Sequence, residues 1–69
     1  MLVKNTKGVI IIFANTLWFL EKFKYDLITY LSSSYKVECY YLREGPSVNQ
    51  ININSLKEKK VVFKKITFF

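Results

Sequence analysis

Residues 8–20, GVIIIFANTLWFL, combine an unbroken apolar run with the polar turn that follows it. Residues 9–13 lack the polar alternation of a strand with one solvent-exposed face, so we expect a central parallel strand that is covered on both faces. Asn15 and Thr16 belong to the turn, and a helical pattern comes next. Ligands of open α/β sheets bind at the carboxyl ends of strands. Asn15 and Thr16 are therefore candidate ligand-binding residues, although both residue types also cap helices.

After this turn, apolar residues recur at spacings of three and four and predict a helix over residues 18–33, with Thr16 as its cap. The serines at 32–34 end this helix, since serine competes for backbone hydrogen bonds. Residues 36–42, KVECYYL, predict the second strand. A strand, a helix and a strand at this spacing form a right-handed crossover unit, so the two strands should be parallel.

The second half of the chain has a weaker pattern. Residues 47–54 favour neither a helix nor a strand. The sequence SLKE at 55–58 matches a capping box and predicts a short helix over about 55–60. Residues 61–69, VVFKKITFF, predict the third strand, and the adjacent Lys64 and Lys65 place it at an edge of the sheet.

The element order βαβαβ predicts an α/β fold, namely one half of a Rossmann-like doubly wound parallel sheet, with three strands in the order 3-2-1. We expect residues 1–69 to form a single, partial domain. The first strand then has an unpaired edge where a fourth strand normally pairs, and the chain ends on Phe68 and Phe69. We infer that the chain is a piece of a larger protein or pairs with another chain.

The composition excludes several kinds of site. The chain has no histidine and one cysteine, Cys39, so it can form no internal disulfide, Cys/His metal centre or Ser/His/Asp triad, and we expect no cofactor. Cys39 should pack as a small buried hydrophobe. The net charge of +6 favours anionic partners. The N-terminus does not match a signal peptide, and the apolar run is shorter than the ~20 residues that cross a bilayer, so we expect a cytoplasmic protein that can also lie at the inner face of the membrane.

The turn and the helix after it contain a recognisable set of short sequence motifs. These residues resemble the start of bacterial family 4 glycosyltransferases of the GT-B type, many of which open with a hydrophobic strand, a similar turn and a similar helix. The matching motifs are Ala14-Asn15-Thr16, Trp18-Phe19-Leu20, Phe23-Lys24 and Asp26-Leu27-Ile28-x-x-Leu31. The likeness covers about residues 7–42, and residues 43–69 share only the pattern of elements.

The resemblance implies the N-terminal, acceptor-side domain of an enzyme that moves a sugar from a nucleotide donor to a saccharide or lipid-linked acceptor in surface polysaccharide synthesis. In that family the nucleotide-sugar half, with its paired glutamates, lies in the C-terminal domain, so we expect this chain to be inactive alone. The glycine-rich loop of many relatives is replaced here by residues 14–16. The acceptor-binding candidates are Asn15, Thr16, Trp18 and Lys24.

Other functions remain open at this stage. Trp18 and Phe19 can stack on a sugar ring or lie against a membrane, although such residues more often pack in a core or an interface. Lys24 can attract an acceptor phosphate or lipid headgroups, or belong to a solvated face. The alternative function is a small stand-alone α/β binding or interaction module that self-associates or completes its sheet with a partner. We expect no nucleic-acid partner, because the sequence has no RNP-like or helix-turn-helix pattern.

Overall fold

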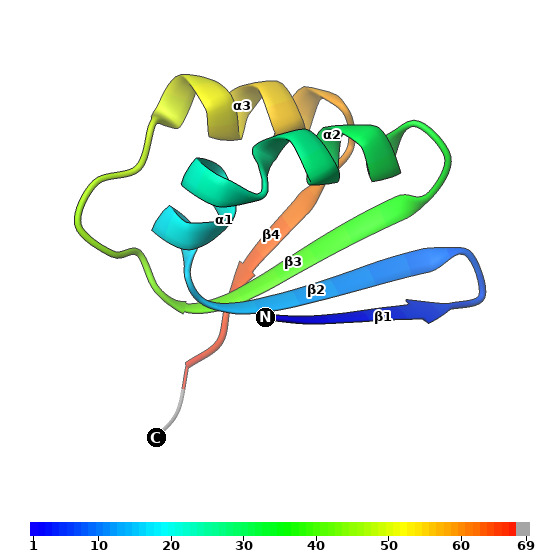
Figure 1. Cartoon of the computed structure of the whole chain (residues 1–69), viewed down its shortest axis with the longest axis horizontal. Helices are drawn as coiled ribbons and strands as arrows, with labels where there is room; N and C mark the ends of the chain where they lie inside the picture. Colours follow the sequence, from blue (N-terminus) through cyan, green and yellow to red (C-terminus); the bar gives the residue numbers. More distant parts are fainter. Residues whose placement is uncertain (68–69) are drawn as a thin grey trace.

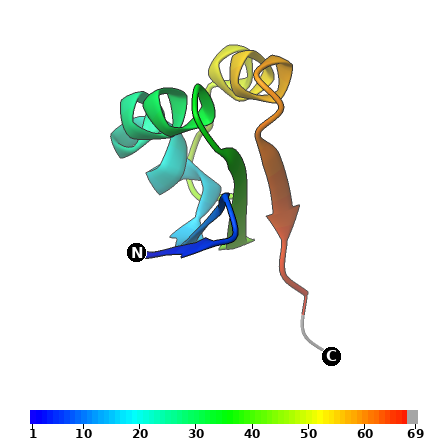
Figure 2. The ribbon, with the colours of Figure 1, turned by 90° about the vertical axis from the view of Figure 1, so that its right-hand side faces the viewer.

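The computed structural model describes residues 1–67, which form four strands and three helices in two layers. The elements run in the order β1 (Leu2–Thr6), β2 (Val9–Thr16), α1 (Leu17–Phe23), α2 (Tyr25–Ser32), β3 (Lys36–Arg43), α3 (Gln50–Glu58) and β4 (Val62–Lys65). The strands form one sheet in the order β1-β2-β3-β4, and the helices lie together on one side of it (Figure 1, Figure 2). The predicted α/β class is therefore confirmed, in the form of a mixed four-stranded sheet.

The three predicted strands correspond to β2, β3 and β4. β2 pairs with β3 and β3 with β4, both in parallel, so their order is the predicted 3-2-1. β2 is longer than expected and runs through Asn15 to Thr16, where Thr16 pairs with Arg43. The prediction that Asn15 and Thr16 form a turn was wrong, because the backbone stays extended until α1 begins.

The fourth strand, β1, was not predicted. β1 pairs antiparallel with β2 through a two-residue turn at Lys7 and Gly8. Both residues have positive φ, 51° and 83°, as a mirror-image hairpin turn requires. The sequence did not predict this strand because Lys4, Asn5 and Thr6 are polar. They can be polar because β1 lies at the exposed edge of the sheet. The edge of β2 that was expected to be unpaired is therefore covered by residues of the same chain.

The single helix predicted over 18–33 is two helices, α1 and α2, which meet at Lys24. The backbone of Lys24 leaves the helical region, with φ −121° and ψ 7°. The predicted cap is confirmed, since Thr16 precedes α1 and accepts a hydrogen bond from the Phe19 amide. The apolar stripe divides at the break: Leu20 and Ile28 are fully buried, whereas Phe23 is 61% exposed.

The third helix begins five residues before its predicted start. α3 is capped by Asn49, whose side chain accepts hydrogen bonds from the amides of Ile51 and Asn52. Ser55, the predicted cap, lies inside the helix. The prediction of a helix over 55–60 was therefore correct in type and wrong in its start, because an asparagine before an Asn/Ile-rich segment carries a weaker local signal than the capping box after it.

The last strand, β4, is shorter than the predicted 61–69. It lies at an edge of the sheet, as expected, and Lys64 and Lys65 are exposed there. The apolar Phe68 and Phe69, on which part of the incompleteness argument rested, lie outside the described residues.

The sheet has one covered face and one open face. Side chains alternate along a strand, and the covered face carries Ile10, Ile12, Ala14, Val37 and Cys39, all at most 5% exposed. Under the helices these side chains form one core with Leu20, Ile28, Ile53 and Leu56. The open face carries the half-buried Val9, Ile11, Phe13, Tyr40 and Leu42.

The expectation that β2 is covered on both faces was therefore wrong for the described chain. The chain steps from β2 to β3 to β4 in one direction across the sheet. Crossover connections between parallel strands are right-handed almost without exception, so two steps in the same direction place their helices on the same face.

Candidate functional site

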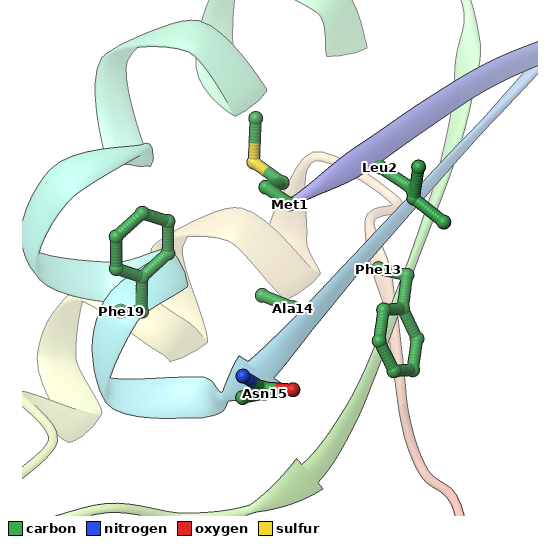
Figure 3. Close-up of a pocket in the computed structure, with 6 residues that line it drawn as sticks. All are labelled: Met1, Leu2, Phe13, Ala14, Asn15 and Phe19. Atoms are coloured by element: carbon green, nitrogen blue, oxygen red, sulfur yellow. The ribbon is translucent and has the colours of Figure 1, made fainter.

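The candidate site lies at the carboxyl end of β2, between the start of β1 and α1 (Figure 3). A pocket of about 260 Å³ is lined there by Met1, Leu2, Phe13, Ala14, Asn15 and Phe19. Figure 3 shows the rings of Phe13 and Phe19 on opposite sides of β2, with the amide of Asn15 at the end of the strand between them. The pocket thus joins aromatic walls to one exposed amide that can both donate and accept hydrogen bonds.

Asn15 is the predicted site residue that lines this pocket. The alternation of β2 buries Ala14 on the covered face and leaves Asn15 exposed. A carboxyl-end position on a parallel strand is where open α/β sheets hold their ligands. Asn15 therefore lies at the end of β2 and lines a pocket there.

Lys24 lies beside the same pocket without lining it. Its Nζ stands 5.8 Å from the centre of the Phe19 ring, a cation–π contact. The break between α1 and α2 puts Lys24 at this distance from a residue five positions earlier. Lys24 therefore brings positive charge next to one aromatic wall.

Thr16 does not face the pocket but fixes one of its walls. Its Oγ1 accepts a hydrogen bond of 3.0 Å from the backbone N–H of Phe19, which starts α1. The hydroxyl is thereby engaged as a helix cap, the alternative that the sequence left open. Thr16 positions Phe19 and is not free to bind a ligand through that contact.

Trp18 joins the start of α1 to the loop after β3. Its backbone N–H donates to the carbonyl of Glu44 at 2.8 Å, and its ring packs edge-to-face on Phe23 with centroids 5.4 Å apart. Gly45 lies against this residue: a Cβ there would stand 2.6 Å from the Trp18 Cβ, and its φ is +92°. Trp18 therefore packs as the second alternative predicted and does not line the pocket.

Phe13 and the two N-terminal residues were missed as pocket residues. Phe19, which the sequence offered for stacking or for packing, lines the pocket. Met1 and Leu2 reach the site only because β1 folds back along β2, with Leu2 opposite Phe13. The Lys7-Gly8 turn was the one local signal for this hairpin.

Glu21 is the one buried charged residue among residues 1–67, with 4% of its surface exposed. Its carboxylate accepts hydrogen bonds from the Asn49 amide at 2.8 Å and from the Asn52 side chain at 3.1 Å. Lys22 pairs with the same carboxylate at 2.9 Å. Burial opposes ionisation, but these hydrogen bonds outweigh it and lower the pKa of Glu21 below its usual value.

The Glu21 contacts tie α1 to the first turn of α3. Each oxygen of the carboxylate is engaged by groups at the start of that helix, where negative charge is also favoured by the helix dipole. Glu21 is therefore a structural carboxylate, and it lies outside the group of residues that line the pocket.

Cys39 packs as predicted, fully buried on the covered face. Burial raises the pKa of its thiol to about 12, so it stays protonated and is a poor nucleophile. Within residues 1–67, no three acidic or sulfur-containing side chains gather as a metal site would require. The described pocket can therefore bind and orient a ligand, and it holds no nucleophile or acid–base pair.

Comparisons with known proteins gave no match: no family model, curated protein or solved structure is significantly similar to this chain. Among the described helices, none is long and apolar enough to cross a membrane.

Proposed function

We propose that this chain is the acceptor-side unit of a glycosyltransferase, which transfers a sugar from a nucleotide donor to a saccharide or lipid-linked acceptor. In this role the unit binds the acceptor at the carboxyl end of β2 and does not transfer sugar alone. The observation that carries the proposal is the pocket of about 260 Å³ in which Asn15 lies between Phe13 and Phe19.

The chemistry of this pocket suits a sugar. Aromatic rings pack against the C–H faces of sugar rings, and an amide can hydrogen-bond to two neighbouring hydroxyls. Small-ligand sites are mostly apolar concavities with a few polar groups that fix orientation. Asn15 supplies such a group, and Lys24 places a positive charge over the ring of Phe19.

The sheet is compatible with this role. The parallel strands β2, β3 and β4 follow the order of the first half of a Rossmann-like sheet, and we propose that they correspond to that half. β1 then occupies the place beside β2 where a further parallel strand pairs in a doubly wound sheet.

The test is a titration of the ¹⁵N-labelled chain with D-glucose and N-acetyl-D-glucosamine, followed by NMR. We expect shifts at the side-chain amide of Asn15 and at the backbone amides of Ala14 and Phe19. Asn15→Ala should weaken binding, whereas Asn54→Ala, an exposed change on α3, should leave it unchanged. Shifts that are absent, or that are the same in both variants, would reject the acceptor role.

The open face of the sheet favours a second candidate, a stand-alone interaction module. Ile11, Phe13, Tyr40 and Leu42 lie side by side there, and none of residues 1–67 forms a layer over them. Such a module would show shifts on these residues as the protein concentration rises, together with a mass above that of the monomer in light scattering. A concentration-independent monomer would remove self-association and leave a module that binds a different partner.

A further inference from the structure

The strand register places the side chains of the open face in rows that cross all four strands. Two neighbouring rows each have a lysine on one edge strand and an apolar residue on the other. The first row is Leu2, Phe13, Tyr40 and Lys64, and the second is Lys4, Ile11, Glu38 and Val62. Lys4 and Lys64 therefore stand at opposite edges of the face, with the mainly apolar side chains of β2 and β3 between them.

Positive charge dominates this face. Lys4, Lys64 and Lys36, which begins β3, are exposed, and none of them forms an ion pair with any of residues 1–67. Lys64 lies over the ring of Tyr40, with its Nζ 5.9 Å from the ring centre. The half-buried carboxylate of Glu38 accepts a hydrogen bond of 2.8 Å from the Tyr40 hydroxyl. The lysines at the margins of the face therefore keep charges that the described chain does not neutralise.

The dimensions of the face fit one α-helix laid along β2 and β3. These strands have eight residues each, which at ~3.3 Å per residue gives a length of about 26 Å. A helix of about 18 residues is ~27 Å long and ~10–12 Å wide. Neighbouring strands lie ~4.8 Å apart, so β1 and β4 are separated by about 14 Å. The flanks of such a helix would therefore lie beside Lys4 on β1 and Lys64 on β4.

The charge pattern decides which occupant fits this face. A second copy of the chain would bring two faces of the same positive sign together, which costs free energy. A lipid surface would take the Glu38 carboxylate, which lies between Ile11 and Val62 in its row, into an apolar layer where a charge is costly. A helix can instead place acidic side chains at both margins and a hydrogen-bond donor opposite Glu38. Helices are also the usual cover for an apolar sheet face.

We propose that the open face docks an acidic amphipathic helix of a partner protein. The apolar stripe of that helix packs on β2 and β3, and its flanking aspartates or glutamates pair with Lys4 and Lys64. This inference goes beyond the acceptor role and does not depend on it. It gives the interaction-module candidate a partner of defined chemistry.

The experiment compares two synthetic helical peptides of about 18 residues. Both have the same leucine stripe with one serine at its centre, and the flanking positions are glutamates in one peptide and lysines in the other. Each is titrated into the ¹⁵N-labelled chain at constant ionic strength and followed by NMR. The glutamate peptide should shift the backbone amides of Ile11 and Tyr40 and bind about ten-fold more tightly than the lysine peptide.

Matched variants separate a specific contact from general attraction by a basic protein. Lys4→Gln and Lys64→Gln should each reduce the preference for the glutamate peptide by about two- to five-fold. Lys57→Gln makes the same change in net charge at an exposed position of α3, in the helix layer, and should keep the preference. Ile11→Ala should weaken the binding of both peptides by the same factor, because it removes apolar contact and no charge. Circular dichroism checks that each variant is folded.

Several outcomes would overturn this inference. These are binding of neither peptide, equal affinity for the two, and a preference that Lys57→Gln reduces as much as Lys64→Gln does. Open-face shifts with phosphatidylglycerol vesicles but with neither peptide would identify a lipid surface instead. Open-face shifts that grow with protein concentration, with a mass above that of the monomer, would identify a second copy. The acceptor role is tested separately, because it is read from the shifts that sugars cause at Asn15.

Discussion

The two faces of the sheet are built from neighbouring residues of the same strands, yet they differ in how deeply their side chains are buried. On β3, Cys39 is fully buried under the helices, whereas Tyr40 is half-buried on the open face and donates a hydrogen bond to Glu38. On β2, Ile12 has no exposed surface, and its neighbour Ile11 is half-buried.

This difference shows that apolar composition does not determine burial. Residues 9–13 are apolar on both faces, but the helices cover one face because both crossovers step in the same direction. The covered face therefore holds the hydrophobic core, and none of residues 1–67 forms a layer over the open face.

The largest expected difference between the faces is in thiol reactivity. The raised pKa of Cys39, about 12 against a usual 9.0, lowers its thiolate fraction at neutral pH by about a thousand-fold. Iodoacetamide should therefore label the folded chain at least that much more slowly than the chain in urea.

The matched control is Tyr40→Cys in a Cys39→Ala background, which moves the thiol by one residue to the open face. It should react at close to the rate of the unfolded chain. Equal protection of the two thiols would show that both faces are covered in solution.

The next largest difference between the faces is expected in the free energy of unfolding that is lost when an apolar side chain is truncated. Ile12→Ala removes fully buried methyl groups and should lower the free energy of unfolding by about 2–5 kcal/mol, whereas Ile11→Ala should cost about 1 kcal/mol. A chain of this size is only marginally stable, so Ile12→Val and Ile11→Val, with smaller costs, serve where the first variant does not fold. Urea denaturation followed by circular dichroism measures each, and equal costs would contradict the one-sided core.

Glu21 tests what holds the covering layer in place. Glu21→Gln keeps the shape of the side chain but removes its charge. It should lower the free energy of unfolding by about 1–3 kcal/mol, because the donors of Asn49 and Asn52 lose a charged acceptor. The exposed Glu58→Gln is the control with the same change in charge.

The pH dependence of this contribution has a defined sign. The folded pKa of Glu21 lies below its usual 4.5, so the ionised carboxylate stabilises the fold above that pH, and the contribution is lost as the pH falls below it. Thermal unfolding at about pH 7 and pH 3 should show a smaller difference for Glu21→Gln than for the unchanged chain. An identical difference would exclude Glu21 as the responsible group.

The smallest effect concerns the start of α3 in the same layer. Asn49→Ala removes the cap and should cost about 1 kcal/mol. Ser55→Ala should cost less, because it loses a hydrogen bond from Tyr25 but gains helix propensity. Thermal unfolding of both variants is the measurement, and a larger cost for Ser55→Ala would support a helix that begins at residue 55.

Part of the candidate site was predictable. Asn15 was placed at a strand end from the apolar run before it, and Thr16 was predicted as a cap from its residue type alone. The sequence did not predict that Phe13, Phe19 and Lys24 lie around one pocket. The position of Lys24 beside Phe19 depends on the break between α1 and α2, and the pocket also depends on β1, which brings Met1 and Leu2 to it.

Local patterns were sufficient for β2, β3, the first crossover and the edge position of β4, because these depend on periodicity and on the right-handed connection between parallel strands. The hairpin of β1 depends on pairing with β2, which the polar residues of β1 do not reveal, and the start of α3 depends on a contact between distant segments. Leu2 meets Phe13, and Asn49 meets Glu21, twenty-eight positions apart. The open face has the same origin: whether an apolar residue is buried depends on the path of the helices around the sheet, a property that no window of sequence contains.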